Sequence, residues 1–212
     1  MNRRTNQIRY AVRSLTGLPK RILWPGITLV LLSVALQAAS SAPEHFLAVR
    51  VMGLTRHLIR VTDNAPYFPM RLDPRGAYVF NPGVLVSVDT SLPRTQCLFW
   101  RNVHAFYLDC ATQPAFYIAS MIFHPRVVEV GKTRVGGGLG IGFNMRRNWQ
   151  RFAEPGIRSQ ILKQTGNFET IFGPYCEIEM ARLINHNLEW VSNFIPGLPV
   201  LVFFSSGVRV RL

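Results

Sequence analysis

One short stretch, residues 135–145 (VGGGLGIGFNM), restricts the possible fold of this chain more than any other. Its bulky apolar side chains alternate with glycine, and a period of two is that of a β-strand. The bulky positions are Val135, Leu139, Ile141, Phe143 and Met145, and the opposite positions are Gly136, Gly138, Gly140, Gly142 and Asn144. In a soluble sandwich the outward face of a strand is polar. Here the other face is glycine, which predicts a cramped interior and a bulky face that meets lipid, as in a small membrane β-barrel.

Other segments with strand patterns accompany this one along the chain. The predicted strands are residues 46–60, 76–90, 96–108, 115–124, 134–145, 169–182, 188–195 and 200–212. Eight strands are enough for the smallest closed barrels, and a tilted strand crosses a bilayer with about 9–11 residues. The two longest connections, 61–75 and 146–168, fall on the same end, as the long outer loops of outer-membrane barrels do. We therefore predict an all-β fold, a closed antiparallel up-and-down barrel of about eight strands within residues 43–212.

Residues 1–42 differ from the rest of the chain. They contain six basic and no acidic residues, and residues 22–39 are apolar and uncharged. A basic start, an apolar core and small residues at positions 38–42 are typical of a secretory signal peptide, and we expect cleavage near Ala39 or Ser40. An uncleaved membrane anchor is the alternative, because the apolar run is almost long enough to span a bilayer. A mitochondrial targeting segment would also be rich in arginine and free of acids.

Composition excludes several kinds of site. The net charge of +13 could suit nucleic acid, but after position 43 the arginines are scattered and form no run or helical stripe, so no nucleic-acid partner is expected. Three cysteines without metal-ligand spacing predict neither a metal site nor a disulfide framework. The glycine stretch lacks a GxGxxG register and a following GK[ST], so phosphate binding is not expected there. No cofactor is predicted.

Charged residues follow the strand parity in three predicted strands. Glu177 and Glu179 share one face, Arg209 and Arg211 share another, and Asp89 lies opposite an apolar face. In a membrane barrel these side chains would face the lumen, where isolated charges are costly, so we predict Glu–Arg pairing there. In a soluble barrel the same residues would face solvent, and this alternative stays open.

Several stretches resemble small outer-membrane β-barrel proteins of Gram-negative bacteria, especially poorly characterised ones of Bacteroidota-like lineages. They are residues 80–88 (FNPGVLVSV), 104–107 (HAFY), 115–118 (AFYI), 138–142 (GLGIG) and 203–212 (FFSSGVRVRL). The resemblance covers residues 76–212 and implies the fold and location, because many such proteins have no assigned activity. One departure is Leu212, where such barrels usually end in an aromatic residue.

The leading hypothesis is an exported outer-membrane barrel with a structural or surface-interaction role, whose partners are membrane lipid and an extracellular ligand or protein at loops 61–75 and 146–168. A periplasmic β-rich binding module, soluble or anchored in the inner membrane, is the first alternative. A lipid-modifying barrel enzyme is the second, since Ser120 with His104, His124 or His186 could form a nucleophile–base pair. No nucleophile motif surrounds Ser120, so we assign no catalytic residue.

Overall fold

The computed structural model describes residues 44–57, 68–92, 97–148, 163–165, 167–197 and 201–212. The predicted signal peptide or anchor, residues 1–42, lies outside this part, as do portions of the two long loops. In the described residues no helix is long and apolar enough to span a membrane.

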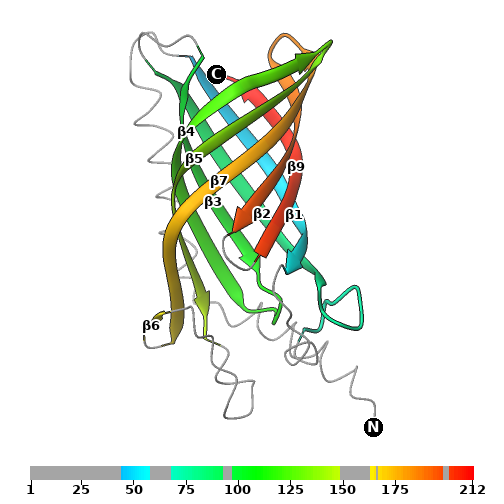
Figure 1. The fold of residues 1–212 in the computed structure, drawn as a ribbon, viewed down its shortest axis with the longest axis vertical. Helices are drawn as coiled ribbons and strands as arrows, with labels where there is room; N and C mark the ends of the chain where they lie inside the picture. Colours follow the sequence, from blue (N-terminus) through cyan, green and yellow to red (C-terminus); the bar gives the residue numbers. More distant parts are fainter. Residues whose placement is uncertain (1–43, 58–67, 93–96, 149–162, 166, 198–200) are drawn as a thin grey trace. The chain divides into compact units, whose positions relative to one another are not determined.

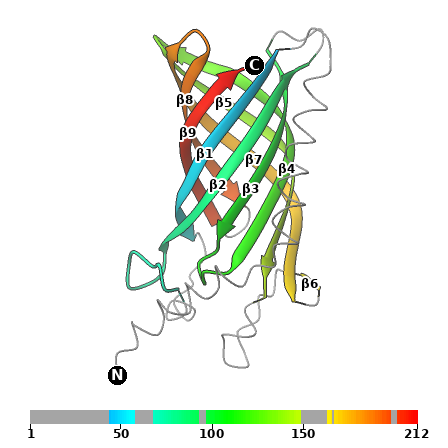
Figure 2. The ribbon, with the colours of Figure 1, turned by 180° about the vertical axis from the view of Figure 1, so that it is seen from behind.

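The described chain forms one antiparallel sheet that closes into a barrel (Figures 1 and 2). The strands are β1 (His45–His57), β2 (Tyr78–Ser91), β3 (Phe99–Leu108), β4 (Pro114–Val130), β5 (Thr133–Arg147), β6 (Lys163–Thr165), β7 (Phe168–Asn185), β8 (Leu188–Gly197) and β9 (Leu201–Arg211). Consecutive barrel strands pair with each other and β1 pairs with β9. β5 pairs directly with β7, and the short β6 is attached to β7 alone. Eight strands thus form the barrel, which confirms the predicted fold.

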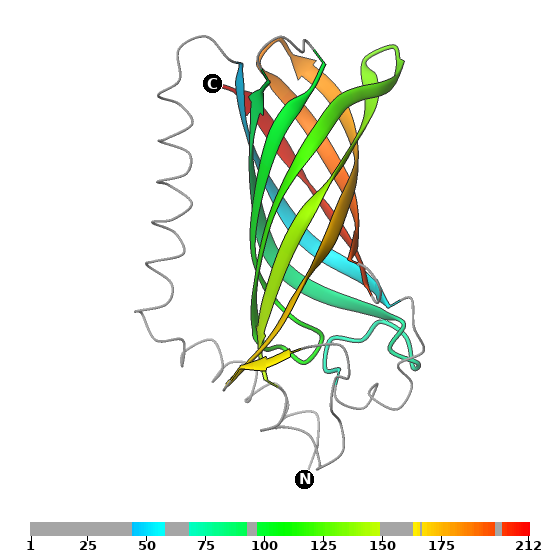
Figure 3. The same cartoon turned by 60° about the vertical axis from the view of Figure 1, so that its left-hand side comes forward.

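The two ends of the barrel differ in their connections. The strand ends that flank residues 92–98, 131–132 and 186–187 lie at the end where β1 begins and β9 ends, which we name the turn end. The strand ends that flank residues 58–77, 109–113, 148–167 and 198–200 lie at the other end, the loop end (Figure 3). Both long loops therefore share one end, as predicted.

Two strands run through prolines and past the predicted strand ends at residues 124 and 195. β4 continues past Pro125 to Val130, and β8 includes Pro196. The prediction that Pro125 closes β4 is wrong because the ladder with β5 changes register between His124 and Val128, and such an irregularity tolerates a residue without an N–H group. A second irregularity places Gly53 of β1 opposite Asn81 and Pro82.

The glycines of β5 make room for the bulky side chains of β4 inside the barrel. A Cβ atom on Gly138 would lie 2.8 Å from Sδ of Met121 and 3.0 Å from the ring of Phe123. A Cβ atom on Gly142 would lie 2.8 Å from the hydroxyl of Tyr117. Met121 and Phe123 belong to the buried apolar cluster of the interior. The interior is therefore filled by side chains, as expected for a barrel of eight strands.

Candidate functional site

The centre of the barrel interior holds a charge network organised around Arg101 of β3. Its Nε and Nη2 atoms donate to the two carboxylate oxygens of Asp89 at 2.7 and 2.6 Å, a bidentate pair. Its Nη1 atom donates to Glu177 at 2.7 Å and to Glu179 at 2.9 Å. The guanidinium carbon also lies 3.4 Å from the centre of the Phe123 ring. One arginine thus contacts three carboxylates from two strands.

Two further arginines complete the coordination of the glutamates. Arg50 of β1 donates to Glu177 at 2.9 Å and also to the hydroxyl of Ser87. Arg209 of β9 donates to Glu179 and, through Nε at 2.8 Å, to Glu189. All three arginines are fully or almost fully buried.

Neutral side chains supply the remaining donors to Glu177. The hydroxyl of Tyr175 donates to its Oε2 atom at 2.9 Å, and the side-chain amide of Asn193 donates to its Oε1 atom. Buried charges are tolerated only when they are paired and hydrogen-bonded, and this carboxylate receives donors on both oxygens.

The network is electrically balanced among the described residues. Arg50, Arg101, Arg134 and Arg209 carry four positive charges, and their carboxylate partners are Asp89, Glu177, Glu179 and Glu189. Every charge has a partner on another strand, and together these eight residues come from seven strands, so the network crosslinks those strands through the interior. It can close the barrel and rigidify it, and it presents no group poised for nucleophilic or acid–base chemistry.

The predicted lumen residues divide between the interior and the rim. Asp89, Glu177, Glu179 and Arg209 lie in the interior and belong to this network. The prediction is wrong for Arg211, whose side chain is 48% exposed and pairs with Glu44. It has the inward parity, but β9 ends there, so the side chain extends into solvent at the turn end.

Sequence reasoning did not place Arg50, Arg101, Arg134 and Glu189 in the network. A parity signal was present for Arg101, which shares its face of β3 with Phe99, Val103, Ala105 and Tyr107. Arg50 likewise stands between the outward Val49 and Val51. Parity could have given their direction, whereas the partners depend on how distant strands meet.

The residues predicted to face lipid all lie on the outer face of β5, but to different degrees. Leu139 is 73% exposed and Ile141 is 55% exposed, and Val135 is also exposed. Phe143 and Met145 are half-buried on the same face. None of the five belongs to the buried apolar clusters of the interior.

The four residues of the enzyme hypothesis lie on β3, on β4 and in the turn after β7. Ser120 donates to Oδ1 of Asn102 at 3.0 Å, whereas His104 stands opposite Ile118 in the ladder. His124 accepts a hydrogen bond from the backbone N–H of Arg126, and His186 lies in an exposed turn. Within the described contacts, no hydrogen bond joins Ser120 to a histidine, so the geometry gives no nucleophile–base pair.

A smaller polar cluster lies toward the loop end. Arg146 of β5 pairs with Glu169 of β7 at 2.8 Å and approaches Asp109 at 3.9 Å. Asp109 in turn accepts backbone N–H bonds from Ala111 and Gln113, which shapes the turn between β3 and β4. No group of three or more metal-ligating side chains occurs in the described part of the chain.

No protein-family model and no curated protein matches the chain. Among solved structures, Neisserial surface protein A is similar, with 10% identity over 80% of this chain and 97% of that chain and a TM-score of 0.47. The N-terminal β-barrel domain of Pseudomonas aeruginosa OprF matches at 9% identity over 81% of this chain and 100% of that chain, with a TM-score of 0.45. A de novo designed transmembrane β-barrel matches at 11% identity over 81% and 98%, with a TM-score of 0.42. At these identities the likeness concerns the fold alone. It does not bear on the Bacteroidota-like lineage, which stays a prediction.

Proposed function

We propose that the chain is an exported outer-membrane β-barrel of a Gram-negative bacterium, with a structural or surface-interaction role and without an open channel. Its partners are the membrane lipid around the barrel and an extracellular ligand or protein at loops 61–75 and 146–168.

The observation that carries this proposal is the inverted polarity of the barrel. Large exposed apolar side chains occur on every barrel strand: Val51, Phe80, Val84, Trp100, Phe106, Ile122, Leu139, Ile141, Ile178, Met180, Trp190, Phe194, Phe204 and Val208. The largest fully buried side chains are by contrast the arginines at positions 50, 101 and 209. Exposure of such a surface to water would be unfavourable, because the free energy of apolar area falls when it leaves water. A bilayer removes that cost.

The backbone supports the same environment. A closed barrel pairs its strands around the whole circumference, which is the condition for a sheet inside hydrocarbon. The two longest connections share one end, as in outer-membrane barrels, whose short turns face the periplasm. The loop end would then face outward. Loops at that end would carry any recognition, since binding residues concentrate on loops held by a rigid scaffold.

The absence of bulk transport follows from the filled interior. The network of four arginines and four carboxylates occupies the barrel interior, and β4 side chains fill the space beside the β5 glycines. An eight-stranded barrel leaves no continuous aqueous pore once its side chains are in place.

Membrane fractionation combined with a heat-modifiability gel tests the proposal. We expect the protein in the outer-membrane fraction, with a faster-migrating folded band that shifts on boiling, and no stepwise conductance in planar bilayers. Recovery in the soluble or inner-membrane fraction without a mobility shift would support the periplasmic binding module instead. If the protein is recovered in the outer membrane, protease accessibility of the loop-end connections in intact cells tests which end faces outward.

A further inference from the structure

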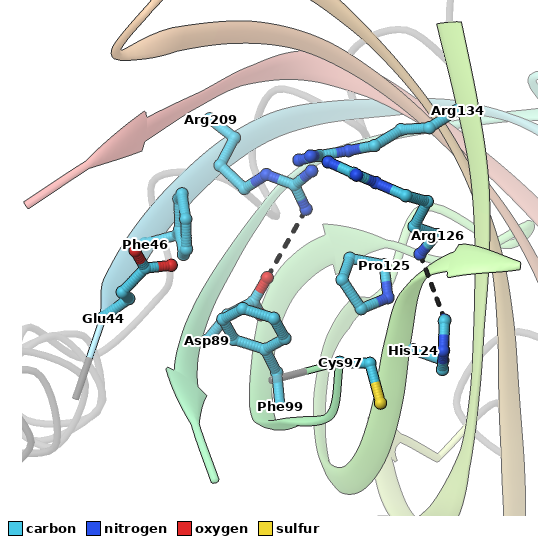
Figure 4. Close-up of a pocket in the computed structure, with 10 residues that line it drawn as sticks. All are labelled: Glu44, Phe46, Asp89, Cys97, Phe99, His124, Pro125, Arg126, Arg134 and Arg209. Atoms are coloured by element: carbon cyan, nitrogen blue, oxygen red, sulfur yellow. Dashed lines mark hydrogen bonds and ion pairs between the residues drawn. The ribbon is translucent and has the colours of Figure 1, made fainter. Parts of the chain in front are cut away.

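The turn end of the barrel interior holds a cavity of about 380 Å³ above the charge network (Figure 4). Its floor is the layer of Asp89 and Arg209, and its wall is formed by the beginnings of β1, β3 and β5 and by the irregular part of β4. The volume falls within the range of about 300–1,000 Å³ that is usual for small-molecule sites. The cavity lies at the opposite end from the two long loops, so the ligand-binding role proposed for those loops does not account for it.

One wall of the cavity is cationic. Arg126 of β4, Arg134 of β5 and Arg209 of β9 extend their guanidinium groups toward one another (Figure 4). Arg134 pairs with Glu189 through Nη2, but its buried Nε has no hydrogen-bond partner in the described structure. Among the described residues, the Arg126 side chain, which is 59% exposed, pairs through Nε at 3.2 Å with the exposed Glu129. Arg134 and Arg126 therefore keep guanidinium donors that an oxyanion would accept from. Arg209 does not, because all three of its guanidinium nitrogens already donate to interior carboxylates.

The backbone is shaped to place Arg126 there. The ladder between β4 and β5 is irregular from His124 to Val128, and the Arg126 N–H donates to Nδ1 of His124 at 3.2 Å. Opposite this irregularity stands Gly136, where a Cβ atom would lie 2.7 Å from the carbonyl oxygen of His124. Irregularities of this kind redirect side chains, and the glycine is required for the close approach.

The facing wall is aromatic. Phe46 and Phe99 pack edge to face with ring centres 5.6 Å apart, and the guanidinium of Arg209 lies 5.8 Å from the Phe46 ring centre. Two carboxylates also line the cavity, and both already have arginine partners. Asp89 pairs with Arg101 and Arg209, and Glu44 pairs with Arg211 outside the lining. The cavity thus combines guanidinium donors on one side with an apolar surface on the other.

We propose that this cavity is a binding site for a small amphipathic anion, a carboxylate or phosphate ester attached to an aromatic or short apolar body. The oxyanion lies between Arg126 and Arg134, and the apolar body packs against Phe46 and Phe99. The site is independent of the role of the loop end, since it is complete within the turn end of the barrel.

Cys97 provides a reporter, because its exposed thiol lines the same cavity. The experiment measures alkylation of Cys97 by N-ethylmaleimide in the folded full-length protein in detergent, with phenyl phosphate as the probe and peptide mass spectrometry as the readout. Phenol and inorganic phosphate serve as the two half-ligands. We expect phenyl phosphate to slow the alkylation of Cys97 at concentrations where neither half-ligand does. Cys110 is an internal reference, because burial raises the pKa of its thiol and keeps it slow under all conditions.

Paired arginine variants separate a built site from general attraction to a basic surface. Arg126→Gln should raise about tenfold the concentration of phenyl phosphate that halves the alkylation rate of Cys97, the effect of losing one charge-assisted hydrogen bond. Arg182→Gln removes the same charge from an exposed position at the same end, outside the cavity, and should leave protection unchanged. The heat-modifiable band verifies that each variant is folded. No protection in the wild-type protein, or equal loss in both variants, would overturn the proposal.

Discussion

Arg101 gives the sharpest test of the interior, because removal of its charge leaves three buried carboxylates with too few partners. Replacement by methionine preserves much of the volume but removes the hydrogen bonds to Asp89, Glu177 and Glu179. At an effective dielectric constant of about 20, one unit pair at about 3 Å is worth roughly 5 kcal/mol before desolvation is subtracted. Removal of one partner from a buried pair costs about 3–5 kcal/mol in measured cases.

The expected result for Arg101→Met is therefore a loss of about 3–5 kcal/mol in the free energy of unfolding. With an m-value of about 2 kcal/mol/M, the urea midpoint of the barrel refolded in lipid vesicles falls by about 2 M. Tryptophan fluorescence and the heat-modifiable band report the same transition. Arg182→Met removes an exposed arginine and serves as the matched control, with a change below about 0.5 kcal/mol.

A double variant decides whether charge balance is the cause. Arg101→Met combined with Asp89→Asn removes one charge of each sign, so the interior returns to neutrality. The double variant should recover at least about half of the stability that Arg101→Met loses, since a neutral replacement of a buried pair is often tolerated. If Arg101→Met unfolds at the same urea concentration as the Arg182→Met control, or if the double variant is less stable than the single one, the balanced-network argument is refuted.

Three further predictions concern the packing, the outer face and a loop. Gly138→Val should prevent formation of the heat-modifiable band, because a Cβ atom there would lie 2.8 Å from the backbone carbonyl oxygen of Ile122, which cannot move aside. Gly173→Val, which has open space around it, should fold. Leu139→Arg should reduce stability in vesicles by about 2–4 kcal/mol if the residue lies near the bilayer centre, and Leu139→Ala should cost less. The N–H group of Tyr78, with that of Arg75, holds the pKa of Asp73 below its usual value of 3.8. This stabilisation is present above pH 3.8 and is lost as the pH falls through the lowered pKa, so the Tyr78 amide shift should titrate below pH 4 in NMR spectra and stop titrating in Asp73→Asn.

The strand pattern was predictable because a period of two is local information. Alternation in residues 134–145 identified the outward and glycine faces of β5, and the same argument located all eight barrel strands. Their ends were less certain, as β4 shows: Pro125 cannot donate to a ladder, yet an irregularity opposite Gly136 lets the strand continue. Whether a proline ends a strand depends on the partner strand, which local pattern does not contain.

The charge network shows where local information ends. Parity placed Glu177, Glu179 and Arg209 on faces that turn out to be interior, but the same parity also selected Arg211, which the end of β9 leaves in solvent. The dominant residue, Arg101, was not recognised because its three carboxylate partners lie 12 to 78 positions away in the chain.

By itself, the sequence determined the alternation of apolar and small or charged residues along each strand, and hence a barrel that is apolar outside and charged within. Only the closed tertiary structure decided which charges meet, because closure brings β1, β3, β7 and β9 around one axis and forces their inward side chains into a common space. The same closure formed the cavity at the turn end, where Arg126, Arg134 and Arg209 come from three different strands. Side-chain direction is a property of the local backbone, whereas partnership depends on which strands surround the same volume.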